Sequence, residues 1–136
     1  MLSTKALLLT AACIIGLPAM ANEKFAGKVT QQISGSVGRS PEVRPLSGAT
    51  VIIGVDLRLD IGQTGTDTVH GKVIAKDVTE SGSYSVNVPA GTYTVICWKQ
   101  GYVPHVERGV RIPGNVDLDI SKDTAGRGLH QHLSYK

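Results

Sequence analysis

The chain has 136 residues, of which 41% are hydrophobic, and its formal net charge at pH 7 is +3. This length corresponds to one domain, which is large enough to bury a core without disulfides or a structural metal. The small charge and the lack of a Lys/Arg run exclude the strongly basic surface that binds nucleic acid or an anionic membrane. We therefore expect a single globular domain with no nucleic-acid partner.

The first 21 residues have the pattern of a cleaved signal peptide. Lys5 supplies a positive charge, residues 6–17 are rich in Leu, Ala and Ile, and Ala19–Ala21 matches an A-x-A cleavage site. The apolar run is shorter than the roughly 20 residues that span a bilayer. The sequence thus predicts a bacterial periplasmic or secreted protein that starts at Asn22 and has no transmembrane segment. A lipoprotein attached through Cys13 is the alternative.

After this leader, alternating apolar and polar residues predict a series of strands without helical periodicity. In chain order they are Phe25–Ile33, Ala49–Val55, Lys72–Thr79, the two strands within Gly82–Pro104, Val106–Ile112 and Asn115–Ile120. Ala49–Val55 is almost continuously apolar, so we expect it to be the most buried strand. Residues 34–44 read as a loop, and residues 56–71 as either a short excursion at a sheet edge or a long loop.

The segment Gly82–Pro104 predicts a β-hairpin. Its first strand alternates Tyr84, Val86 and Val88 with polar residues, and Pro89-Ala90-Gly91 supplies a turn. In its second strand Tyr93, Val95 and Cys97 share one face. Cys97 is the only cysteine after the predicted leader, so we expect no disulfide within the chain, and we interpret Cys97 as a small buried apolar side chain. The alternatives are a metal ligand and a disulfide to another chain.

Seven strands with closely spaced turns favour an all-β fold, a seven-stranded antiparallel Greek-key β-sandwich. We assign residues 22–120 to this domain and residues 121–136 to a polar C-terminal tail. Within the tail, Leu129–Lys136 either pairs as a last strand or hangs free.

Three turn-and-strand motifs indicate a family. They are Gly27-x-Val29 followed by Pro45-Leu46-Ser47-Gly48-Ala49-x-Val51, then Thr79-x-x-Gly82-x-Tyr84, and finally Pro89-Ala90-Gly91-Thr92-Tyr93-x-Val95 with Gly101-Tyr102. Together they resemble the carboxypeptidase regulatory-like domain. The resemblance implies a transthyretin-like (prealbumin-like) sandwich, which in that family is usually a non-catalytic appendage.

Nothing in the sequence predicts catalysis. It contains no H-E-x-x-H, G-x-S-x-G or phosphate-binding glycine motif. Hydroxyisourate hydrolases also have the transthyretin-like fold, but the ending Leu133–Lys136 does not match their characteristic C-terminal tetrapeptide. We expect no enzyme activity, and a hydroxyisourate hydrolase-like enzyme is the weakest alternative.

The tail contains His130-Gln131-His132, a pattern that suits a metal ion. In an extended chain, residues two apart project to the same side. Two imidazoles would then converge as Cu²⁺ and Zn²⁺ sites require, with His105 or His70 as a third ligand. The alternative is a solvated tail that binds no metal.

Trp98 suggests a contact surface. It should point away from Cys97, and if exposed beside Lys99 and Tyr102 it would form a patch for a protein or carbohydrate partner. The alternative is that residues 57–61 cover it. The sequence therefore predicts an exported, non-catalytic module for binding or assembly, with a periplasmic copper- or zinc-binding protein as the second hypothesis.

Overall fold

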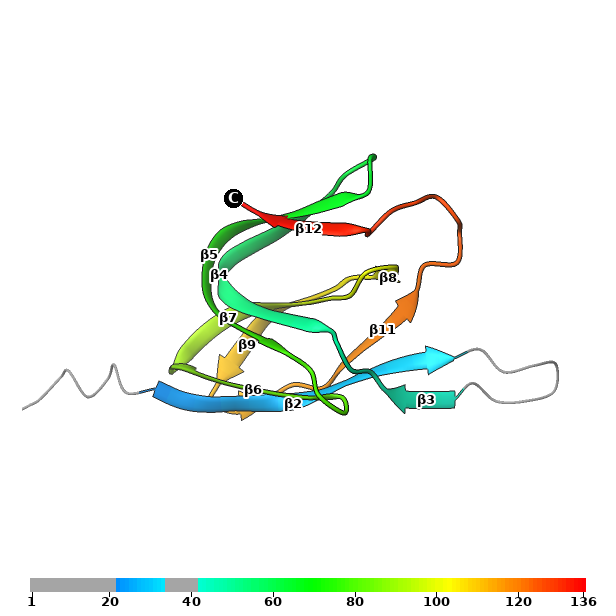
Figure 1. Ribbon diagram of the computed structural model, residues 1–136. Coiled ribbons are helices and arrows are strands. Elements are labelled where there is room, and N and C mark those ends of the chain that lie inside the picture. Colours follow the sequence, from blue (N-terminus) through cyan, green and yellow to red (C-terminus); the bar gives the residue numbers. More distant parts are fainter. Residues whose placement is uncertain (1–21, 34–41) are drawn as a thin grey trace, which may run out of the picture.

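The computed structural model describes residues 22–33 and 42–136 (Figure 1). The predicted signal peptide, including Cys13, and most of the predicted loop at 34–44 lie outside these residues. The described residues form strands and turns and contain no helix. Accordingly, none of them belongs to a helix that is long and apolar enough to cross a membrane.

Eleven described strands form two sheets (Figure 1). The strands are β2 (Asn22–Ile33), β3 (Glu42–Pro45), β4 (Thr50–Ile61), β5 (Thr66–Val78), β6 (Ser83–Pro89), β7 (Gly91–Trp98), β8 (Tyr102–Val103), β9 (His105–Ile112), β10 (Gly114–Asn115), β11 (Leu118–Lys122) and β12 (His132–Tyr135). In the six-stranded sheet, β2 pairs with β3, β6, β10 and β11, and β8 pairs with β11. The five-stranded sheet has the order β12-β5-β4-β7-β9.

The main hydrophobic core contains side chains from both sheets. β2 contributes Phe25 and Val29, which are fully buried, and β6 contributes its alternating apolar residues. β4 is the middle strand of the five-stranded sheet, and Val51, Ile52 and Ile53 are all fully buried. Consecutive side chains point to opposite faces, so both faces of β4 are covered there. The predicted burial of this strand and the all-β class are confirmed.

The predicted hairpin at residues 82–104 is wrong, although both of its strands exist. β6 pairs with β2, whereas β7 pairs with β4 and β9, so the chain passes from one sheet to the other at Ala90. The hydroxyl of Tyr93 donates a hydrogen bond to the carbonyl of Pro89 across this connection, at 2.7 Å. The alternation predicted which side of each strand is buried but carried no information on which strand lies beside it.

Residues 56–71 form neither a loop nor a short excursion. β4 continues to Ile61 and β5 begins at Thr66, so most of the segment is a long antiparallel extension. Its pairing shifts around Asp56, which has a positive φ of 53°, and opposite it Gly71 has a φ of 114°. A side chain on Gly71 would come within 2.6 Å of the Asp56 carbonyl oxygen. This irregularity lies where β4 and β5 bend strongly (Figure 1).

The bend encloses a second, smaller hydrophobic cluster. It contains Ile52, Leu57, Val69 and Ile96, all 1% exposed or less. Ile96 therefore faces away from Cys97, as the alternation in β7 predicted, and Cys97 lies in the main core.

The predicted polar tail, residues 121–136, contributes to strands of both sheets. β11 extends to Lys122, and β12 pairs in parallel with β5, from His132 opposite Thr66 to Tyr135 opposite Val69. Thus, of the two alternatives for Leu129–Lys136, the one in which it pairs as a last strand is correct. β10 and β11 also run parallel to β2, so the purely antiparallel pairing of seven strands was wrong in both count and direction.

The fold predicts an unreactive Cys97 thiol. Burial raises its pKa to about 12, which leaves about a thousandfold less thiolate than an exposed cysteine has at pH 8. In a Cys13→Ser variant, a thiol reagent at pH 8 should label the native protein far more slowly than the guanidinium-unfolded chain. Because the thiol pKa is higher in the folded state, stability should decline as the pH rises from the ordinary thiol pKa toward 12. Equal labelling rates in native and unfolded protein would contradict this placement.

Candidate functional site

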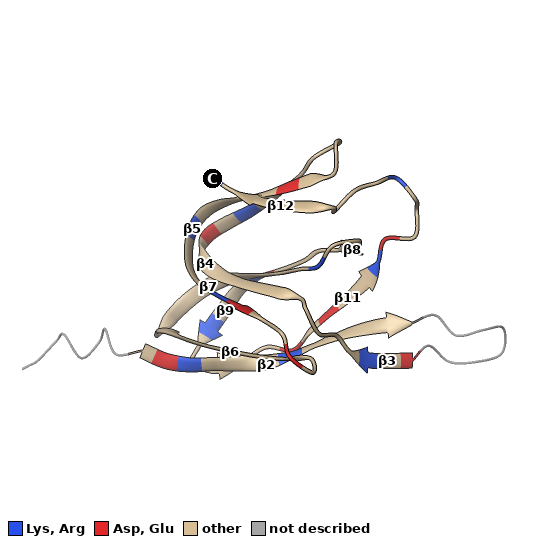
Figure 2. Cartoon of the chain, in the orientation of Figure 1, with Lys and Arg blue, Asp and Glu red and all other residues tan. Residues whose placement is uncertain are grey.

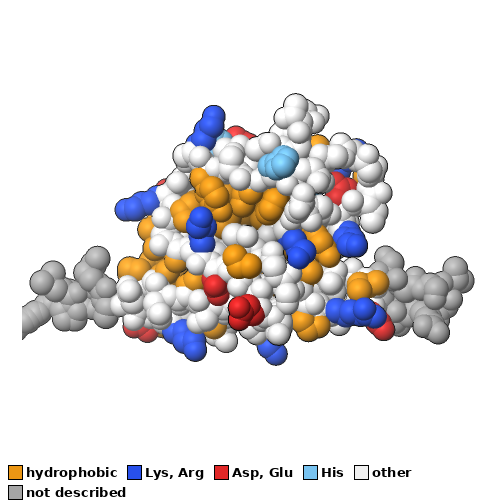
Figure 3. Space-filling view, viewed as in Figure 1, with side chains coloured by type: hydrophobic (Ala, Val, Ile, Leu, Met, Phe, Trp, Pro, Cys, Tyr) orange, Lys and Arg blue, Asp and Glu red, His pale blue; other side chains and the backbone are white. Residues whose placement is uncertain are grey.

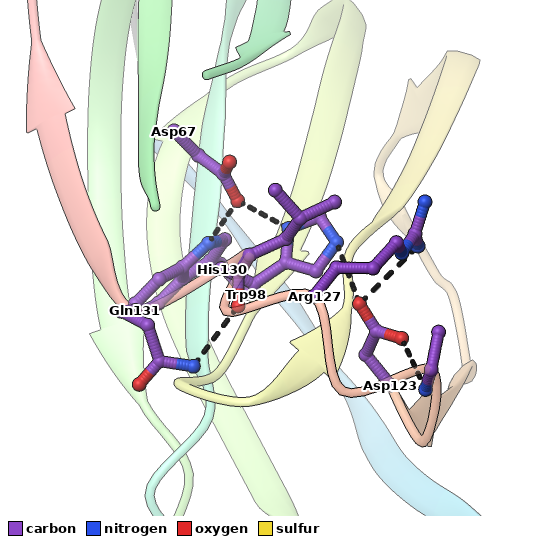
Figure 4. A network of polar contacts seen from close by, with 8 residues as sticks. Asp67, Trp98, Asp123, Arg127, His130 and Gln131 are labelled. Carbon is purple, nitrogen blue, oxygen red and sulfur yellow. Dashed lines mark hydrogen bonds and ion pairs between the residues drawn. The ribbon is translucent and has the colours of Figure 1, made fainter. Parts of the chain in front are cut away.

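A buried carboxylate joins three distant parts of the chain (Figure 4). Oδ2 of Asp67 accepts a hydrogen bond from the indole Nε1 of Trp98 at 2.8 Å and another from Nδ1 of His130 at 2.7 Å. The three residues are 0%, 9% and 4% exposed. Oδ1 of Asp67 is buried and has no hydrogen-bond partner among the described residues.

Each of these residues is positioned by a different element. Asp67 lies at the start of β5, Trp98 ends β7, and His130 precedes β12 with a φ of +58°. The carbonyl of His130 accepts a hydrogen bond from the amide of Gly101 at 2.8 Å. The next two amides, those of Gln131 and His132, both donate to the carbonyl of Gly65. Backbone bonds on both sides of His130 therefore fix its position.

A second carboxylate lies on the other side of the imidazole. Oδ2 of Asp123 is 3.7 Å from Nε2 of His130 and accepts a hydrogen bond from Arg127 at 3.4 Å (Figure 4). The amide of Ala125 donates to Oδ1 of Asp123 at 3.1 Å. The imidazole of His130 thus lies between two carboxylates, with Nδ1 toward Asp67 and Nε2 toward Asp123.

A pocket of about 390 Å³ adjoins this network. Two of its lining side chains, Arg127 and His130, are polar; the others are apolar, namely Leu59, Ile61, Val103, Pro104, Val106 and Leu129. Leu59 and Val106 also pack against the second hydrophobic cluster. The space-filling view shows hydrophobic side chains gathered in a hollow beneath β12 (Figure 3). The pocket thus combines an apolar lining with a few polar groups, as small-molecule sites commonly do.

The three predicted metal ligands do not converge. His130 is buried and bonds Asp67, His132 is exposed, and Nε2 of His105 contacts Glu107 at 2.8 Å. Among the described residues, no group of three His, Cys, Asp or Glu side chains could hold a metal ion. The prediction assumed an extended chain over residues 130–132, whereas the left-handed backbone at His130 breaks that geometry.

The predicted exposed patch of Trp98, Lys99 and Tyr102 is also wrong. Trp98 is 9% and Tyr102 6% exposed. The Tyr102 hydroxyl donates to Oε1 of Gln31 at 2.8 Å, and Nζ of Lys99 donates to the carbonyl of Ser47 at 2.7 Å. Trp98 does lie on the opposite side of β7 from Cys97, but its indole contacts Asp67 instead of solvent.

Sequence reasoning missed both carboxylates of the network. Asp67 lies between two threonines, and Asp123 lies in the segment interpreted as a solvated tail, so neither has a neighbour that indicates burial. A long-range partner is what buries each of them. The one available signal was Trp98, because the indole N–H of a buried tryptophan needs a hydrogen-bond acceptor.

No protein-family model matches the sequence, and no curated protein matches it. The resemblance to the carboxypeptidase regulatory-like domain therefore stays a prediction.

The network predicts that two neighbouring histidines differ strongly in their effect on stability. His130→Ala removes a buried partner of Asp67 and should lower the free energy of unfolding by about 3 kcal/mol. His132→Ala changes an exposed side chain and should change it by less than about 0.5 kcal/mol. Urea denaturation measures both. Equal effects of the two substitutions would show that Asp67 does not depend on His130.

Proposed function

We propose that this chain is an exported, non-catalytic β-sandwich module that binds an apolar group of a ligand or protein partner in the pocket beside His130. The observation that carries the proposal is the lining of that pocket, in which six apolar side chains accompany two polar ones. Such a lining favours an apolar group over a carbohydrate, whose hydroxyls need many polar partners.

Export is proposed from the pattern of residues 1–21. The two-sheet architecture is compatible with membership of the transthyretin-like sandwiches and with the resemblance to the carboxypeptidase regulatory-like domain. In scaffolds of this kind, loops and added segments carry function. Here Arg127, Leu129 and His130, from the segment before β12, form one wall of the pocket.

The surroundings of His130 support a non-catalytic role. Its Nδ1 bonds Asp67 and its Nε2 faces Asp123, so both nitrogens are directed at carboxylates of the protein itself. A general base needs a nitrogen within hydrogen-bond reach of the substrate proton. We therefore interpret His130 as a residue that holds the pocket wall in place.

Two matched valines test the proposed site. Val103 lines the pocket and is 46% exposed, whereas Val78 lies at the end of β5, outside the pocket lining, and is 54% exposed. Octan-1-ol serves as a neutral apolar probe, and fluorescence of Trp98, the single tryptophan of the chain, reports its binding. Val103→Glu places a charge in the pocket and should weaken binding by about tenfold, equivalent to about 1.4 kcal/mol. Val78→Glu should leave it unchanged. If both variants bind the probe like the unsubstituted protein, the pocket is not the site.

A further inference from the structure

The two polar side chains that line the pocket, Arg127 and His130, indicate which kind of ligand it binds. Arg127 lines the pocket, and 61% of its side chain is exposed. Among the described residues its one hydrogen bond runs to Asp123 and measures 3.4 Å, beyond the usual range for a charged pair. A guanidinium has five N–H donors, so most of those of Arg127 are available to a ligand.

Two acidic residues near the pocket, Asp123 and Asp60, already have partners. Asp123 is only 8% exposed, and it receives the amide of Ala125 as well as Arg127. Asp60 pairs with Arg58 and His70. No acidic residue is among the side chains that line the pocket. The cationic group therefore has no acidic competitor within the lining.

The polar side chains lie on one side of the pocket. Arg127 and His130 come from the segment before β12, while Leu59 and Ile61 come from β4 and Val106 from β9. A ligand can thus place an apolar body against the strands while an anionic end meets the guanidinium. Carboxylates suit this contact because Arg can bond both of their oxygens.

Resting on the proposed function, we propose that the pocket selects molecules in which an apolar group adjoins a carboxylate, with Arg127 as the residue that binds the carboxylate. Two sources have this chemistry. One is a free aliphatic or aromatic acid, and the other is the C-terminal residue of a polypeptide with an apolar side chain.

The test compares octanoate with octan-1-ol in the full chain, again with Trp98 fluorescence as readout. Arg44 provides the matched control, because it is also 61% exposed and also bonds a carboxylate, that of Glu42 on β3. Octanoate should bind about tenfold more tightly than octan-1-ol to the unsubstituted protein and to Arg44→Gln. Arg127→Gln should remove this preference while it preserves binding of octan-1-ol.

The outcomes separate the two proposals. Equal binding of both probes by the unsubstituted protein, or a preference that survives Arg127→Gln, overturns the carboxylate inference but leaves the apolar site. Failure of both probes to bind overturns the proposed function and the inference with it. A peptide that ends in leucine distinguishes the sources: its free-acid form should bind about tenfold more tightly than its amide. Tighter binding of that peptide than of octanoate assigns the carboxylate to a polypeptide end, and the reverse assigns it to a free acid.

Discussion

The Asp67 carboxylate is the group on which the contact between β5, the end of β7 and the segment before β12 depends. It is fully buried, and a buried carboxylate is tolerated only when it receives hydrogen bonds. Trp98 and His130 supply these from the end of β7 and from the segment before β12. The contact of His130 with Oδ2 of Asp67 therefore helps to attach the end of the chain to the five-stranded sheet. His130 also lines the pocket, so one residue of the pocket wall is bonded directly to this carboxylate.

Backbone geometry makes that contact possible. β4 and β5 bend strongly, as Figure 1 shows, and their register shifts at Asp56 and Gly71. At the turn between them, Gly65 has a φ of 95°, and a side chain there would come within 2.8 Å of the Gly128 carbonyl oxygen. Its own carbonyl accepts the amides of Gln131 and His132. Figure 2 shows charged residues of both signs on both sheets. We therefore attribute the position of the chain end to the local hydrogen bonds at Gly65 and Asp67 and not to attraction between oppositely charged faces.

Local periodicity predicted most strands and their buried faces, but it predicted neither their partners nor the site. β6 and β7 were found by alternation, yet the turn at Ala90 gave no sign that it connects two sheets. Residues 56–71 contain glycines and charged residues, which usually indicate loops. β4 and β5 nevertheless extend into this segment, because each strand provides hydrogen-bond partners for the backbone of the other. Asp67 and His130 are 63 residues apart, and the left-handed backbone at His130 has no signature in His130-Gln131-His132. Buried polar contacts over such a distance depend on tertiary structure and lie beyond any local pattern.

Hydrogen exchange of the Trp98 indole N–H measures the buried carboxylate contact most directly. Trp98 is the single tryptophan, so its indole proton gives one resolved NMR signal. If the proton is donated to a fully buried Asp67, it should exchange with deuterium as slowly as the backbone amides at the centre of β4, through global unfolding. Exchange within the first spectrum, while the β4 amides stay protected, would show that the indole reaches solvent and would contradict the account.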